Sequence, residues 1–115
     1  MASLKFPMSV AEKQQALFVK PLPPSELSAW GRTYQDAGQP YDALEFFQAA
    51  MDRQALEALC EKAVDAADLV LFLNACRALG SDPEPAKLQA LRQRALDAGL
   101  ESVARRVSTL LAPKT

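Results

Sequence analysis

The chain contains no histidine among its 115 residues, and only two cysteines, four glycines and one tryptophan. Without histidine it lacks the commonest general base and the commonest metal ligand, which excludes a Ser-His-Asp triad. Two cysteines cannot supply the roughly four ligands of a zinc site. Glycine-rich phosphate loops and a Gly-x-Ser-x-Gly elbow are also missing. We therefore expect no enzyme activity, no bound metal and no cofactor.

The chain also has no large excess of positive or negative charge and no long apolar run. The chain has 13 basic and 14 acidic residues, a formal net charge of −1, which argues against nucleic acid held by bulk charge. A membrane span needs ~18 apolar residues, whereas the longest run here is Leu69 to Leu73. The first ten residues do not have the form of a signal peptide. We expect a cytoplasmic protein that binds neither nucleic acid nor membranes.

What the chain does have is apolar side chains at helical spacing. Half of its residues are hydrophobic, which is enough for a packed core. No run of β-branched residues alternates with a period of two, so strands are not expected. The sequence therefore predicts an all-α fold. Helices are expected over about 10–19, 26–36, 40–51, 53–64, 69–79, 83–96 and 100–111.

Capping residues and prolines set the predicted boundaries. Ser9 and Glu12 have the spacing of a capping box, and Pro21, Pro23 and Pro24 stop the helix that it begins. We expect residues 1–24 to be an N-terminal helix with a proline-rich linker and residues 25–115 to be a repeat domain. Four residues are predicted as N-caps of later helices: Ser25, Asp52, Asp68 and Asp82.

A short turn sequence recurs along the chain. Asp36-Ala37-Gly38, Asp65-Ala66-Ala67 and Asp97-Ala98-Gly99 are spaced 29 and 32 residues apart, each between two amphipathic helices. Self-similarity at about 30 residues is typical of stacked helical hairpins. The expected architecture is an α-α superhelix of about three stacked antiparallel hairpins plus the N-terminal helix.

One hairpin resembles a known repeat family. The pattern Leu27-x-x-Trp30-Gly31-x-x-Tyr34, followed by Ala43-x-x-x-Phe47 and Ala50, is similar to the tetratricopeptide repeat over residues 25–51. Ala55 stands where the family usually has a closing proline. The other two hairpins resemble degenerate repeats of the tetratricopeptide or HEAT type, because alanine replaces the tyrosine in both.

The resemblance implies a concave face, lined by the first helix of each hairpin, that binds a protein or peptide. The family's groove-facing positions fall on Ser28, Arg32, Gln35 and Asp36 in the first hairpin, Glu57, Glu61 and Val64 in the second, and Gln89, Gln93 and Leu96 in the third. Seven of them form the expected partner-binding row: Ser28, Arg32, Gln35, Glu57, Glu61, Gln89 and Gln93. This polar row lacks the Lys and Asn clamp of the chaperone-binding members, so a C-terminal carboxylate is not the expected ligand. We expect a non-catalytic protein–protein interaction module or scaffold. The alternative is a chaperone-like assembly protein that forms a weak homo-oligomer through its repeat ends.

Two local questions stay open in the sequence. Phe46 lies off the Ala43–Phe47 face, so it is either an exposed anchor for a partner or, as we favour, a packed side chain. Cys60 and Cys76 lie within apolar helical patterns, which favours two buried free thiols. A disulfide between them would require neighbouring antiparallel helices.

Overall fold

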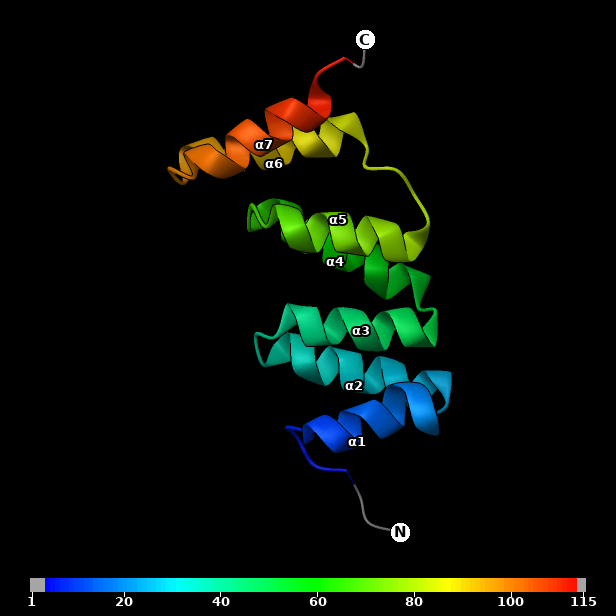
Figure 1. Ribbon diagram of the computed structural model, residues 1–115. Helices are drawn as coiled ribbons and strands as arrows, with labels where there is room; N and C mark the ends of the chain where they lie inside the picture. The colour runs from blue at the N-terminus through cyan, green and yellow to red at the C-terminus, as the bar shows by residue number, and fades with distance from the viewer. Residues whose placement is uncertain (1–3, 114–115) are drawn as a thin grey trace. The chain divides into compact units, whose positions relative to one another are not determined.

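Every regular element of the computed structural model, which describes residues 4–113, is a helix (Figure 1). The all-α prediction is confirmed. The chain divides into two compact units, the first extending to Ala55 and the second beginning at Leu56. The elements of the described residues are α1 (Val10–Gln14), the π-helix η1 (Gln15–Val19), α2 (Pro24–Asp36), α3 (Pro40–Ala50), α4 (Arg53–Asp65), α5 (Leu69–Leu79), α6 (Pro85–Asp97) and α7 (Glu101–Leu111).

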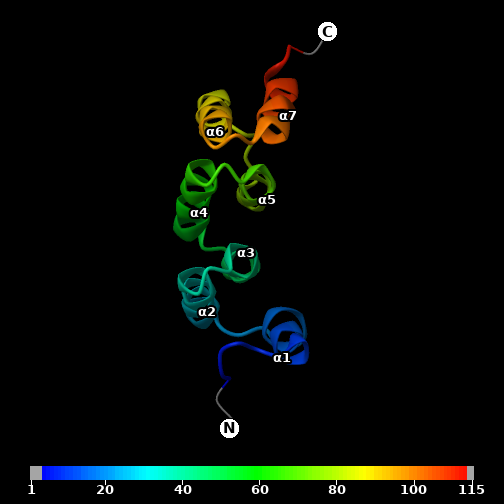
Figure 2. The same cartoon turned by 90° about the vertical axis from the view of Figure 1, so that its left-hand side faces the viewer.

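The first unit is an antiparallel hairpin of α2 and α3 with the N-terminal helix beside it. Figure 2 shows α1 and α3 on the same side of α2, and η1 packs against α3. The boundary expected after residue 24 falls inside this unit. The N-terminal helix is therefore part of the first unit, and its buried residues Ala16 and Leu17 belong to the core of the chain.

The second unit contains two hairpins, α4 with α5 and α6 with α7. Within it, α4 and α6 lie on one side and α5 and α7 on the other (Figures 1 and 2). The turn between α4 and α5 packs on the second hairpin through small residues, because Ala67, Ala95 and Ala104 form one buried cluster, with Val103 against it. Consecutive helices thus pair as hairpins throughout the described residues.

The three recurring turns have the same backbone geometry. Gly38, Ala67 and Gly99 all have positive φ, at 77°, 55° and 76°. In each turn the amide of the next residue donates to a carbonyl five residues back, that of Tyr34, Ala63 or Ala95, at 2.9, 2.9 and 2.7 Å. This is the Schellman ending of a helix. The predicted equivalence of the turns is confirmed, including the position where alanine replaces glycine.

Three predicted helix starts are confirmed and two are wrong. The Ser9–Glu12 capping box is present, and the carboxylates of Asp52 and Asp68 accept from Ala55 and Leu71 amides. However, Ser25 and Asp82 do not cap. Helix α2 has Pro24 at N1, and α6 has Pro85 at N1. Proline fits N1 because its fixed φ is helical and it has no amide to leave unpaired; the last proline of each cluster takes that position.

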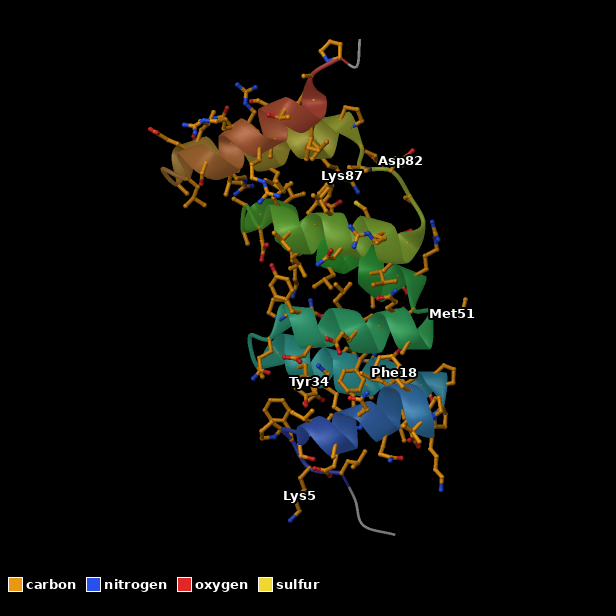
Figure 3. All side chains as sticks on the ribbon, in the orientation of Figure 1. Lys5, Phe18, Tyr34, Met51, Asp82 and Lys87 are labelled. Carbon is orange, nitrogen blue, oxygen red and sulfur yellow. The ribbon has the colours of Figure 1, made fainter. Side chains whose placement is uncertain are left out.

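The apolar helix faces that the sequence spacing predicts as the core are largely buried, with four clear exceptions. Phe47, Leu59 and Phe72 are fully buried as expected. In contrast, Met51 is 85% exposed at the end of α3 (Figure 3), because it adopts the left-handed conformation that ends the helix. Leu96, Leu100 and Leu110, also expected in the core, are 46%, 41% and 49% exposed. Leu96 and Leu110 lie near the C-terminal ends of α6 and α7, and Leu100 directly precedes α7.

We predict that Gly31→Ala destabilises the first unit although alanine is the better helix former. The new Cβ would lie against Cε1 of Phe47, 2.6 Å from its Cδ1, and overpacking of this kind costs about 1–3 kcal/mol. Helix propensity alone would instead stabilise by about 1 kcal/mol. Urea unfolding should show a lower free energy of unfolding, with Ser25→Ala, an exposed position on α2, as the control. An increase for Gly31→Ala would mean that Phe47 moves aside without cost.

A candidate binding surface on α2

The residues of the predicted polar row lie in both units. Ser28, Arg32 and Gln35 lie on α2 in the first unit. The Ser28 hydroxyl donates to Oδ2 of Asp52 at 2.8 Å, and Oδ1 of the same carboxylate caps α4. Ser28 therefore holds the junction after α3. Arg32 is exposed and Gln35 half-buried.

The second unit holds the other four residues, two on α4 and two on α6. All four are exposed. Glu61 Oε1 lies 2.9 Å from Lys87 Nζ, and this hydrogen bond raises the pKa of Lys87. Gln93 donates to Asp97 on its own helix at 2.9 Å. Glu61 thus joins the first helices of two hairpins. The other two members are Glu57 and Gln89.

A different face of α2 carries a hollow. Its volume is about 250 Å³, and it lies within the first unit. Three of its α2 residues, Ala29, Trp30 and Thr33, follow Glu26 at the i+3, i+4 and i+7 positions, which places all four on one helix face. The fifth lining residue, Phe6, comes from the segment before α1 and is 40% exposed. The hollow is therefore mainly apolar, with one carboxylate.

Tyr34 holds Phe6 and Trp30, the two aromatic residues that form the wall of the hollow, in place. Its hydroxyl accepts the buried amide N–H of Met8 at 3.0 Å, which fastens the N-terminal segment to α2. Its ring meets the edge of Phe6 at a centroid distance of 5.0 Å and stacks on Phe46 at 5.3 Å. Trp30 stacks on the same Phe46 at 6.5 Å. Phe6 and Trp30 are thus positioned by a network that extends into the core.

Phe46 is packed, as favoured from the sequence. It is fully buried and lies against the rings of both Tyr34 and Trp30. The interpretation of Phe46 as an exposed partner anchor is wrong. Phe18 and Tyr41 are exposed elsewhere, whereas Phe6 and half-buried Trp30 keep part of their surface at the hollow.

An ion-pair cluster attaches α1 to α3. Lys13 pairs with Asp42 and, at 2.9 Å, with Oε2 of Glu45. Burial lowers the pKa of Lys13, but the hydrogen bonds to Asp42 and Glu45 outweigh that effect, and the pKa is raised. Lys13 therefore stays charged over the whole physiological pH range, and its ion pairs are with residues of α3. Such partly exposed pairs add modest stability, typically below about 1 kcal/mol each.

The two cysteines are buried free thiols, as the sequence favoured. They hydrogen-bond to each other, which places Cys60 of α4 beside Cys76 of α5. Burial, with the neighbouring Cys76, raises the pKa of Cys60 from 9.0 to about 11. Burial also raises the pKa of Cys76. The thiolate, not the thiol, is the nucleophile, so burial and the raised pKa values lower the reactivity of this pair.

Comparison of the chain with family models, with curated proteins and with solved structures finds no match. The likeness to the tetratricopeptide repeat therefore rests on the motif residues themselves. Among the helices of residues 4–113, none combines the length and the apolar character needed to cross a membrane.

Sequence reasoning missed the hollow. It identified Trp30 only as a packing residue of the resemblance and gave Phe6 no role. Phe6 reaches α2 through a contact between Met8 and Tyr34, which are 26 residues apart. One sequence signal was available, because seven of the eight aromatic residues precede residue 48. That clustering marks the first unit as the aromatic-rich one.

We predict that Tyr34→Phe loosens the N-terminal segment more than the core. The substitution leaves the buried Met8 amide without its acceptor, and an unpaired buried donor costs about 1–3 kcal/mol. Hydrogen exchange should accelerate at Met8 by a larger factor than at the amides of α3. Equal acceleration at both places would show that the hydroxyl does not hold the segment separately.

We also predict that the thiols react slowly in the folded protein. A Cys60 pKa of about 11 instead of 9.0 leaves about 100-fold less thiolate at pH 8. Reaction with a chromogenic disulfide reagent should be at least that much slower than in urea. The same pKa shift makes the free energy of unfolding depend on pH. The stabilisation that comes from keeping the Cys60 thiol protonated is complete below pH 9.0 and is lost as the pH rises to about 11. Fast labelling at pH 8 would contradict the buried placement.

Proposed function

We propose that this chain is a non-catalytic module that binds a protein or peptide partner, and that the hollow on α2 is its main contact. The observation that supports this most directly is the composition of the hollow. Two aromatic rings, from Phe6 and Trp30, line an open space of about 250 Å³. Aromatic side chains at concave surfaces dominate the binding energy of protein interfaces.

The support beneath the rings strengthens the proposal. Binding loses free energy when side chains must be ordered on contact. Here Tyr34 and Phe46 stack against the wall residues before any partner arrives. The wall is therefore preorganised, and little further ordering is needed.

The polar row on α2 is a second contact under this proposal. Helical geometry places Arg32 about 120° around the axis from Glu26 but only about 60° from Ala29, so the row begins at the edge of the hollow. Of its three residues on α2, Ser28 is already bonded to Asp52. Arg32 is the member best placed to add a polar contact at this end of the row.

The test is selection of peptides from a random library against the whole chain, followed by affinity measurement with a blocking variant. Ala29 is exposed and lines the hollow, so Ala29→Gln places a long neutral side chain there without adding charge. We expect selected peptides to bind the variant about tenfold more weakly or worse, as for loss of a hot-spot contact. The control is Ala49→Gln, at an exposed alanine of α3.

Two results would contradict this proposal. Equal affinity for the wild type and Ala29→Gln would remove the hollow as the contact. If affinity then fell on Arg32→Glu, the binding site would be the polar row. Failure to select any peptide, together with concentration-dependent sedimentation, would favour the alternative of self-assembly.

A further inference from the structure

We propose that the hollow on α2 recognises a basic side chain of the partner, with arginine as the preferred anchor. This rests on the proposed function and names the chemistry of its ligand. The inference comes from the combination of two aromatic rings with the Glu26 carboxylate at one small site.

The site has the two components that bind a cation with an apolar stem. A guanidinium or ammonium group over an aromatic ring is attracted by the negative face of the ring, most strongly for tryptophan. Glu26 precedes Trp30 by four residues, so its carboxylate and the indole are neighbours on the helix surface. A basic side chain can place its methylene groups against Phe6 and Ala29 while its charge meets Glu26.

Charges around the hollow favour a cation. No basic residue lines it. Arg32 is not among the lining residues, although it follows Ala29 by three residues and so lies beside the hollow, and Lys13 is held by Asp42 and Glu45. Figure 3 shows the Lys5 side chain, next to Phe6 in sequence, pointing away from the helices.

A second carboxylate continues the same face. Asp36 is exposed and follows Thr33 by three residues, one turn beyond the hollow. An acidic peptide or a phosphate in the hollow would meet Glu26, and no cation in the lining would balance it; the nearest cation on this part of α2, Arg32, lies one turn from Asp36 and is shared with that carboxylate. A nucleic-acid base could stack on Trp30, but its phosphates would meet the same repulsion.

The size of the hollow indicates a single side chain. Sites for drug-sized ligands run from about 300 to 1,000 Å³, and this hollow is about 250 Å³. Arginine is preferred to lysine because its planar guanidinium can stack on a ring and hydrogen-bond a carboxylate at the same time.

The experiment compares two probes that differ in charge and share their shape. N-acetyl-arginine amide and N-acetyl-citrulline amide are titrated separately into the full chain. Trp30 is the only tryptophan, so its fluorescence and its indole N–H resonance report on the hollow without further labelling. We expect saturable changes with the arginine probe and about fivefold to tenfold weaker binding of citrulline.

Variants assign the effect to individual groups. Glu26→Gln should weaken the arginine probe toward the citrulline level and leave citrulline unchanged, because the ion pair is lost while the attraction of the cation to the Trp30 ring remains. Glu101→Gln makes the same charge change at an exposed position of α7 in the second unit and should have no effect. Phe6→Leu changes the surface that the methylene groups contact and should weaken arginine and citrulline by similar factors.

The outcomes separate this inference from the proposed function. Equal affinities for arginine and citrulline would overturn the cation preference, while binding at Trp30 would still support a partner site. If only N-acetyl-leucine amide changes the Trp30 signals, the cation preference is also overturned, and a partner site at Trp30 is still supported. If none of the three probes alters Trp30, and the selected peptides also bind Ala29→Gln normally, both proposals fail. A response to a short single-stranded oligonucleotide but not to arginine would likewise overturn the basic-anchor proposal.

Discussion

Tyr34 connects three parts of the first unit that are separate in sequence. Its hydroxyl fixes the segment before α1, its ring covers Phe46 of α3, and its carbonyl closes the turn after α2. A smaller residue could close the turn, as Ala63 and Ala95 do in the second unit. Only an aromatic residue with a hydroxyl makes all three contacts, and both aromatic rings of the hollow rest on it directly or through Phe46.

The second unit packs its helices through small side chains. Where the first unit stacks rings, this unit brings helices together at Ala67, Ala95 and Ala104 and at the paired thiols of Cys60 and Cys76. Ala67 pays a conformational cost at positive φ that glycine would avoid. Its methyl group is buried in the alanine cluster, which gives a physical reason for alanine at that turn.

Local sequence signals predicted most of the fold and little of the candidate site. The helices, their order and the equivalent turns follow from spacing and caps that act within a few residues, as at Asp52 and Asp68. Asp82 was a wrong N-cap because Pro83 and Pro85 both suit N1 and local rules do not rank them, and Ser25 was wrong because the helix already begins at Pro24. The 46% exposure of Leu96 could not be read from helical spacing, because burial depends on packing between helices that are distant in sequence.

Local sequence patterns did not predict the hollow, because its walls are brought together by contacts between residues far apart in the sequence. Phe6 has no helical pattern around it, and its place beside α2 depends on one hydrogen bond between Met8 and Tyr34. The same hydrogen bond explains how an aromatic residue can remain 40% exposed and still be ordered. In solvent, a loose Phe6 would gain by burying its ring completely. The contact with Tyr34 holds the Phe6 ring so that part of its surface stays open beside Trp30 and Glu26. A ligand that covers this surface buries apolar area without first rearranging the protein.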